Sequence, residues 1–294
     1  MTTAADFRPR RSCLYMPGAK PRALEKAKSL PADVLILDLE DSVAPEQKAE
    51  ARDTVVGVVS ERWYGDREVI IRTNGLDTPW GADDLAAAAG AGPNGVLVPK
   101  VTTAEDIVAI DRSLDDAGAN GAMRLWVMIE MPLAILNIRD IAAASASTRL
   151  CGFMMGTNDL AKEMNAVYTP DRLAFQTALS LSVAAARAYG LVVLDSVYND
   201  FRNEAGLEAE CQQGRVLGFD GKTLIHPAQL ETANRVFSPA PEEVVQARAI
   251  IDAFALPENQ GKGVITLDGR MTELLHLEQA RRLVSIADAI AARA

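Results

Sequence analysis

Short apolar runs rich in β-branched residues recur along this chain, separated by alanine- and leucine-rich segments with helical spacing such as Pro170–Tyr189. Runs of this kind are typical of parallel strands covered by helices, and their alternation with helices indicates β/α units. The runs lie at Ser12–Met16, Val34–Leu39, Val69–Arg72, Gly95–Pro99, Leu125–Ile129, Leu150–Met155, Leu191–Leu194 and, more weakly, near Val216–Phe219 or Thr223–Ile225.

Eight such units predict an α/β fold, a (β/α)₈ TIM barrel, which a chain of 294 residues can form with an extension to spare. A doubly wound open sheet is the alternative, but no G-x-G-x-x-G follows the first run. We expect the barrel at residues 1–235 and a C-terminal helical extension at 236–294. The extension reads as a helix at Glu242–Phe254, a glycine-rich loop at Asn259–Gly269 and a helix at Glu273–Ala292. It could serve as a lid, a dimer arm or simple packing.

Composition narrows the class of protein. Hydrophobic residues make up 49% of the chain, so a sizeable core can form, and the net charge of −10 argues against a nucleic-acid partner. No apolar run is long enough for a membrane span or a signal peptide, so we expect a cytoplasmic protein without a membrane partner. Three cysteines without a Cys-x-x-Cys motif predict neither a disulfide framework nor a zinc site.

The first 28 residues depart from the acidic average, with seven basic side chains against two acidic ones. A ligand carrying a cluster of phosphates would suit such a patch. On charge alone, a basic terminus that is simply exposed to solvent explains the pattern equally well.

Polar residues follow the apolar runs repeatedly, at the strand ends where barrel enzymes place their chemistry. The segments, from first strand to eighth, are Met16-Pro17-Gly18, Asp38-Leu39-Glu40-Asp41, Arg72-Thr73-Asn74-Gly75, Pro99-Lys100, Glu130, Gly156-Thr157-Asn158-Asp159, Asp195, and Lys222 with His226.

Glu130 and Asp159 form the strongest pair, because each follows an apolar strand and the two strands are neighbours. Two converging carboxylates repel each other unless a hard cation lies between them, and Mg²⁺ typically takes one or two protein carboxylates. Asn158 or Asp159 could instead cap a helix that begins near Leu160.

Arg72 is a cation on an apolar strand, and an arginine can grip a carboxylate through two parallel hydrogen bonds. We predict that it holds a substrate carboxylate; an ion pair with Asp38 or Glu40 is the structural alternative. Those two acids lie on one face of their strand and could support metal-bound water, Arg72 or Lys100, whereas Asp41 and Ser42 could cap the next helix.

Other chemistries have less support in the residues. His226 and His276 are the only histidines, and there is no G-x-S-x-G, so a Ser-His-Asp triad is not predicted. A Schiff-base aldolase would use Lys100 or Lys222. A pyruvate-type class II aldolase acting on a keto acid without coenzyme A would be expected to carry a histidine base near strands one to two, and the sequence has none there.

Seven segments together resemble the citrate lyase β-subunit-like family of the HpcH/HpaI aldolase superfamily, and they span nearly the whole chain. They are RSCLYMPGAKPRALEKA, LILDLEDSV, IIRTNG, VLVPKV, VMIEMP, MGTNDLAKE and GFDGKTLIHPAQ. GTNDLAKE, VYNDFRNEAGLEAEC and LDGRMTELLH carry a closer likeness to malyl-CoA thioesterase and β-methylmalyl-CoA lyase relatives.

The resemblance implies an enzyme that uses Mg²⁺, held by Glu130 and Asp159, on a malyl-CoA-type thioester. Arg72 would bind the substrate carboxylate, with Asp38, Glu40 and Lys100 near the substrate. Coenzyme A would lie near the basic region of strand one, with Tyr15, Lys20 and Arg22 as its candidate ligands. The tail would cover the active site of a neighbouring subunit in a trimer or a multiple of it.

One position departs from the family pattern. Lyase members carry an aspartate in a G-x-M-I-D-type tail segment, and the matching segment here, from Gly269 onward, places Glu273 there. One extra methylene displaces the carboxyl group, which puts proton transfer to an enolate in doubt. Two outcomes therefore stay open: carbon–carbon cleavage to glyoxylate, or thioester hydrolysis to malate with Glu273 as general base. The sequence leaves the acyl group, and coenzyme A versus acyl-carrier protein, undecided.

Overall fold

The computed structural model describes residues 8–293, which form two compact units. One unit comprises Arg10–Asn234, and the other comprises residues 235–293 together with residues 8 and 9. Within the described residues, no helix is both long enough and apolar enough to cross a bilayer.

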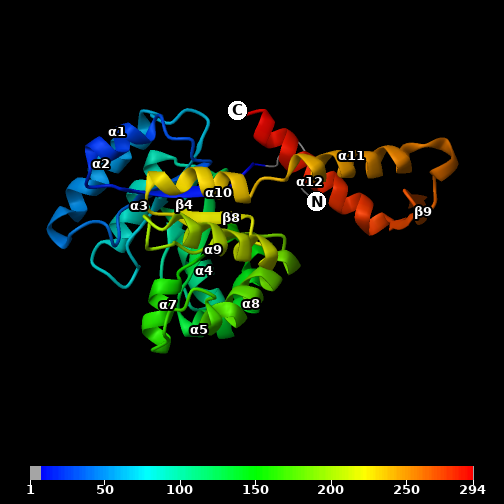
Figure 1. Ribbon diagram of the computed structural model, residues 1–294. Coiled ribbons are helices and arrows are strands. Elements are labelled where there is room, and N and C mark those ends of the chain that lie inside the picture. Colours follow the sequence, from blue (N-terminus) through cyan, green and yellow to red (C-terminus); the bar gives the residue numbers. More distant parts are fainter. Residues whose placement is uncertain (1–7, 294) are drawn as a thin grey trace. The chain divides into compact units, whose positions relative to one another are not determined.

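The larger unit is a closed barrel of eight parallel strands, each paired with its neighbours in chain order and with β1 joined to β8 (Figure 1). The prediction of a (β/α)₈ barrel is confirmed, and the open sheet is wrong. The strands are β1 (Ser12–Pro17), β2 (Val34–Asp38), β3 (Glu68–Arg72), β4 (Gly95–Val98), β5 (Arg124–Ile129), β6 (Leu150–Met155), β7 (Val192–Asp195) and β8 (Gly221–Leu224).

Helices connect the strands and cover the outside of the barrel. They are α1 (Pro21–Ala27), α2 (Lys48–Ser60), α3 (Gly81–Ala91), α4 (Ala104–Asp116), α5 (Pro132–Leu136), α6 (Ile138–Ala143), α7 (Thr157–Met164), α8 (Gln176–Ala188), α9 (Glu204–Leu217) and α10 (Leu230–Val236). The proposed strand at Val216–Phe219 is wrong, because these residues end α9 and turn into β8. The helical segment predicted from Pro170 begins only at Gln176.

The barrel interior is filled by alternate residues of successive strands, with the indole of Trp126 as its largest fully buried side chain. Its members are Cys13, Val34, Ile36, Ile70, Leu97, Trp126, Met128, Met154 and Leu194. Side chains alternate along a strand, so the residue two positions further on points to the same side. The carboxyl ends of these strands therefore present a layer of inward-facing positions at one rim, called here the barrel mouth.

The basic N-terminal patch does not stay together. Arg10 pairs with Glu68 at 2.7 Å, and Arg11 pairs with Asp33 at 2.8 Å. These pairs lie at the amino ends of β1, β2 and β3, which is the opposite end of the barrel from its mouth. Arg10 and Arg11 therefore stabilise the strand starts and do not lie with the other basic residues that a phosphate ligand at the mouth would use.

Asp195 and Lys222 also depart from the predicted mouth. Leu194 faces the interior, so its neighbour Asp195 faces the helices. There Lys222 Nζ lies 3.3 Å from Asp195 Oδ2 and 2.6 Å from Oε1 of Glu210 on α9. Arg172 completes the cluster at 2.7 Å from Asp195. Two cations and two carboxylates thus join the strands to α9 in a buried ionic cluster.

The smaller unit is a helical hairpin in which α11 (Pro241–Ala255) packs along α12 (Leu274–Ala291) (Figure 1). Phe254, Ile265 and Leu277 form its small core. The predicted glycine-rich loop is instead largely a β-hairpin of β9 (Val264–Leu267) and β10 (Arg270–Glu273). Its two-residue turn, Asp268-Gly269, has positive φ at both positions, which is the conformation that Asp-Gly favours.

Candidate active site at the barrel mouth

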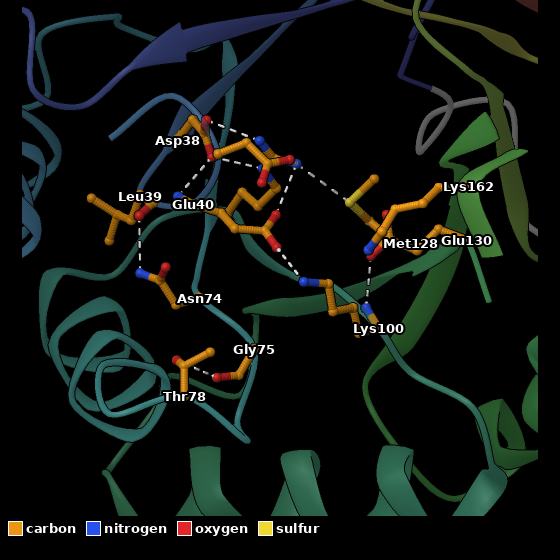
Figure 2. A network of polar contacts seen from close by, with 12 residues as sticks. Asp38, Leu39, Glu40, Asn74, Gly75, Thr78, Lys100, Met128, Glu130 and Lys162 are labelled. Carbon is orange, nitrogen blue, oxygen red and sulfur yellow. Dashed lines mark hydrogen bonds and ion pairs between the residues drawn. The ribbon is translucent and has the colours of Figure 1, made fainter. Parts of the chain in front are cut away.

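Three charged side chains enter the mouth because of strand alternation. Asp38, Arg72 and Glu130 each lie two residues beyond an interior core residue of their strand, and all three are at most 7% exposed. Figure 2 shows Asp38, Glu40 and Glu130 gathered in one polar network. The sequence prediction that these strand-end residues meet at one rim is consistent with this placement.

Arg72 is held by a two-point ion pair with Asp38. Its Nε and Nη2 donate to the two Asp38 carboxylate oxygens at 2.6 and 2.9 Å. Burial alone would raise the pKa of Asp38, but Arg72 outweighs it and the pKa is lowered. The structure therefore contains the ion pair of Arg72 with Asp38, and the Nη1 atom is turned to a second carboxylate, that of Glu40.

Glu40 contacts that remaining side of Arg72, with 2.9 Å from Nη1 to Oε2, and its other oxygen lies 3.8 Å from Lys100 Nζ. Burial, opposed by Arg72 and aided by Asp41, raises the pKa of Glu40 to about 7. Helix capping by Asp41 or Ser42 is wrong: the following 3₁₀ turn begins at Pro45 with no side-chain cap, and Ser42 donates its backbone N–H to Asp38.

Glu130 is 1% exposed and accepts the Lys100 backbone N–H at 2.8 Å. Lys100 adopts a left-handed conformation, with φ of 59°, in giving this bond. Burial, followed by the charges of Glu40 and Asp159, raises the pKa of Glu130 to about 8. Gly156 makes room for this carboxylate, because a Cβ there would lie 2.5 Å from Glu130 Oε2.

Asp159 lies in the first turn of α7, half-buried at the same mouth. This helix begins at Thr157 with Gly156 as its N-cap and no side-chain cap, so capping by Asn158 or Asp159 is wrong. No group of three or more metal-ligating side chains occurs within residues 8–293. A cation at the mouth would therefore rest on Glu130 and Asp159 and take its other ligands from water or substrate.

The three candidate coenzyme A residues divide between two environments. Tyr15 faces the barrel interior, and the Arg72 guanidinium lies 4.7 Å from the centre of its ring. Burial raises the pKa of Tyr15, so its hydroxyl stays a neutral donor. Lys20, in the β1–α1 connection, and Arg22, in the first turn of α1, are exposed on the mouth side of the barrel.

Lys48 is a part of the site that the sequence reasoning missed. Its side chain is 6% exposed and donates to the carbonyls of Leu39 and Glu40 and to Asn74 Oδ1. Helical periodicity held a signal for it, because Lys48 is in phase with the buried Ala51 and Val55 on α2.

Lys100, Lys222 and His226, the residues considered for covalent or histidine-based catalysis, are engaged in ways that disfavour it. Lys222 is fully buried, and although burial alone would lower its pKa, Asp195 and Glu210 raise it. The Lys100 pKa is also raised, by Glu40 and Glu130 against burial. A Schiff-base lysine needs a lowered pKa. His226 Nδ1 accepts the Ala228 N–H, and the His226 ring stacks on Phe201.

Glu273 belongs to the smaller unit, where it ends β10 and precedes α12. Its backbone N–H donates to His276 Nδ1 at 2.9 Å, which fixes the start of the helix. Glu273 remains a catalytic candidate by its sequence position.

Comparison with known proteins places these features in context. A family model described as HpcH/HpaI aldolase/citrate lyase matches residues 11–227. The chain is 51% identical to a (3S)-malyl-CoA thioesterase of Cereibacter sphaeroides, with 98% of each chain covered. It is 35% identical to the citrate lyase subunit beta of Escherichia coli, over 96% of this chain and 94% of that one.

Among solved structures, CitE from Mycobacterium tuberculosis in complex with magnesium, acetoacetate and coenzyme A is similar, with a TM-score of 0.76 and 27% identity. The similarity covers 94% of this chain and 97% of that one. A citrate lyase from Burkholderia xenovorans LB400 has the same fold, with a TM-score of 0.82 at 19% identity, 99% of this chain and 96% of that one being covered.

Proposed function

Because the chain belongs to the HpcH/HpaI aldolase/citrate lyase family, we propose that it is a Mg²⁺-dependent enzyme acting on a malyl-CoA-type β-hydroxyacyl thioester. The observation that carries the proposal is the buried Glu130 carboxylate. It shares the mouth with Asp159 and faces the Arg72–Glu40 pair, and no ion pair to it is formed within residues 8–293.

Glu130 and Asp159 fit a magnesium ion. Both offer hard oxygen ligands, and their mutual repulsion with Glu40 is what a divalent cation relieves. When bound there, the ion supplies charge stabilisation for oxygens of the substrate. This chain's own residues do the rest: Arg72 orients the substrate carboxylate, and Lys100 holds Glu130 through its backbone N–H.

We expect magnesium affinity to rise with pH. In the metal-free protein the pKa of Glu130 is about 8, and the ion binds the carboxylate rather than the protonated acid. Affinity should therefore increase roughly tenfold per pH unit below 8 and level off above it, with proton release on binding. Calorimetry between pH 6.5 and 9 in buffers of different ionisation enthalpy measures both. An affinity that is flat across this range contradicts the expectation.

Replacing Gly156 by alanine should weaken magnesium binding by about tenfold or more, because the new methyl group displaces the Glu130 carboxylate. Gly57→Ala is the matched control, since a Cβ at Gly57 in α2 meets nothing within 4 Å. The control should retain wild-type affinity and lose no stability. Equal affinity in both variants would show that the Gly156 position does not govern Glu130. Calorimetry provides the measurement.

We assign the two ends of the substrate to different parts of the mouth. The acyl carboxylate would lie against the Nη1 side of Arg72, next to Glu40 and Lys100, with the Tyr15 ring beneath the guanidinium. The phosphates of coenzyme A would lie near Lys20 and Arg22, which are exposed on the mouth side. Tyr15, first considered a coenzyme A ligand, is better suited by this placement to the acyl end.

The reaction outcome depends on Glu273, which we propose acts from the tail of a neighbouring copy. Malyl-CoA, incubated with protein and Mg²⁺, separates the alternatives. Thiol release with malate and no glyoxylate identifies hydrolysis, and glyoxylate with acetyl-CoA identifies carbon–carbon cleavage. We propose hydrolysis, on the Glu273 substitution and the 51% identity to a thioesterase. Glu273→Asp, compared with the wild type, should shift product toward glyoxylate; no thioester turnover in either protein would reject the proposed function.

We also propose a homo-oligomer, a trimer or a multiple of it. The smaller unit exposes apolar side chains that an interface would bury, among them Val245, Val264, Met271, Leu274 and Leu275. Sedimentation equilibrium tests the stoichiometry. A cytoplasmic location is proposed on the free thiols of Cys13, Cys151 and Cys211, which suit a reducing compartment.

A further inference from the structure

A buried polar network that supports the barrel mouth begins at Lys48, the first residue of α2. The ammonium group of Lys48 donates to Leu39 O at 2.8 Å, to Glu40 O at 2.7 Å and to Asn74 Oδ1 at 2.7 Å. An ammonium group has three donors, so these three bonds use all of them. Two of the acceptors are backbone carbonyls of the segment that carries Glu40, and the third belongs to the loop after β3.

This polar network continues from Asn74 to Asp84 of α3. Asn74 donates its amide to Leu39 O at 2.9 Å and to Asp84 Oδ2 at 2.6 Å, and its backbone N–H also reaches Asp84. Asp84 is fully buried and receives Arg52 Nε at 2.7 Å. Figure 2 shows Asn74 beside Leu39 within this network. Two loops and two helices are thereby tied to one another through paired polar groups.

The hydrogen bonds of this polar network meet at Glu40. Its backbone N–H donates to Asp38 Oδ1 at 3.0 Å, and its carbonyl accepts the Lys48 ammonium, so its main chain is held on both sides. Its carboxylate is then presented to Arg72 Nη1 at 2.9 Å. Loss of the Lys48 bonds would leave Asn74 Oδ1 without its donor. Leu39 O would keep only the Asn74 amide and Glu40 O only the Val43 N–H, so the Glu40 segment would be held less firmly.

We propose that Lys48 is a positioning residue for the thioester reaction: it holds the Glu40 segment so that the Glu40 carboxylate keeps Arg72 aimed at the substrate carboxylate. The kinetic part rests on the proposed function, whereas the structural part does not. A lysine that only packs α2 against the barrel would affect stability alone. Replacement of a positioning lysine would in addition alter the local order of two loops and the binding of substrate.

The test compares Lys48→Met, which keeps length without donors, with Lys48→Arg, which restores donors and charge. Asp53→Met is the matched control, placing methionine at an exposed position of the same helix. Amide hydrogen exchange is measured across residues 39–44 and 73–80, and KM and kcat are measured with malyl-CoA. Lys48→Met should speed exchange in both loops and raise KM by roughly tenfold or more, with a smaller change in kcat. Lys48→Arg should recover part of both effects.

Unchanged exchange and unchanged KM in Lys48→Met would overturn the proposal, as would faster exchange spread evenly over all barrel strands with KM unaltered. If Lys48→Met does not fold, Lys48→Gln, which keeps two donors, takes its place with the same two criteria. A wild-type protein without thioester activity would reject the proposed function. The exchange data would still decide whether Lys48 holds the two loops.

Discussion

Glu130→Gln is expected to abolish thioester turnover while making the metal-free protein more stable. The variant keeps the size of the side chain and an acceptor for the Lys100 N–H, but it removes the charge that binds magnesium. We expect kcat/KM to fall by about 10³-fold or more, the scale of losing a principal charge-stabilising group. A coupled thiol assay at saturating Mg²⁺ measures this loss.

The gain in stability follows from the pKa of Glu130, which folding raises from 4.5 to about 8. A carboxyl group whose pKa is higher in the folded state favours folding less as pH rises from its unfolded value through its folded value. The Glu130 contribution therefore lowers wild-type stability between about pH 4.5 and 8, and Glu130→Gln removes that contribution. At pH 8 the variant should be more stable by on the order of 1–3 kcal/mol, and at pH 4.5 the difference should vanish.

Urea unfolding in the presence of a chelator, at pH 4.5 and pH 8, tests the stability part. Asp53→Asn is the control for loss of a surface carboxylate and should change neither stability nor turnover. A Glu130→Gln protein that is less stable than wild type at pH 8, or that retains turnover, contradicts the role assigned to this residue. The combination of lost activity and gained stability is typical of a functional site that is strained for its task.

Lys222→Met is expected to produce the largest loss of stability, about 3–5 kcal/mol in the free energy of unfolding, because it leaves buried carboxylates short of a cation. Lys222 is fully buried between Asp195 and Glu210, with Arg172 as the other cation of the cluster. The measurement is urea denaturation at pH 7. Lys222→Met combined with Glu210→Gln is the matched variant, and it should recover part of the loss because it removes one unpaired charge.

The effect should depend on pH. Burial alone would raise the pKa of Asp195, but Lys222 and Arg172 lower it below its usual value of 3.8. A carboxyl group with a lowered folded pKa stabilises the fold above its unfolded pKa and stops doing so as pH falls through the folded value. The Lys222→Met loss should thus be full at pH 5–8 and shrink below about pH 4. A loss under about 1 kcal/mol at pH 7 would mean that the cluster relaxes around methionine.

Much of the fold was predictable because its signals are local. Apolar runs and helical spacing are properties of a few consecutive residues, and they identified eight β/α units that close into a barrel. The two-residue alternation likewise brought Asp38, Arg72 and Glu130 to one rim. The error in the C-terminal loop came from a local signal that was missed, the Asp268-Gly269 turn of the hairpin.

The sequence by itself determined which charged residues stand at the ends of strands, because strand period and strand end are set by neighbours along the chain. Only the tertiary structure decided which of them act together. Asp195 and Lys222 face α9 rather than the mouth, and Lys48 reaches the Glu40 carbonyl from a helix. The physical reason is that a buried charge is stable only when it is paired with an opposite charge or a hydrogen-bonding group, and those partners come from segments that meet only when the barrel closes.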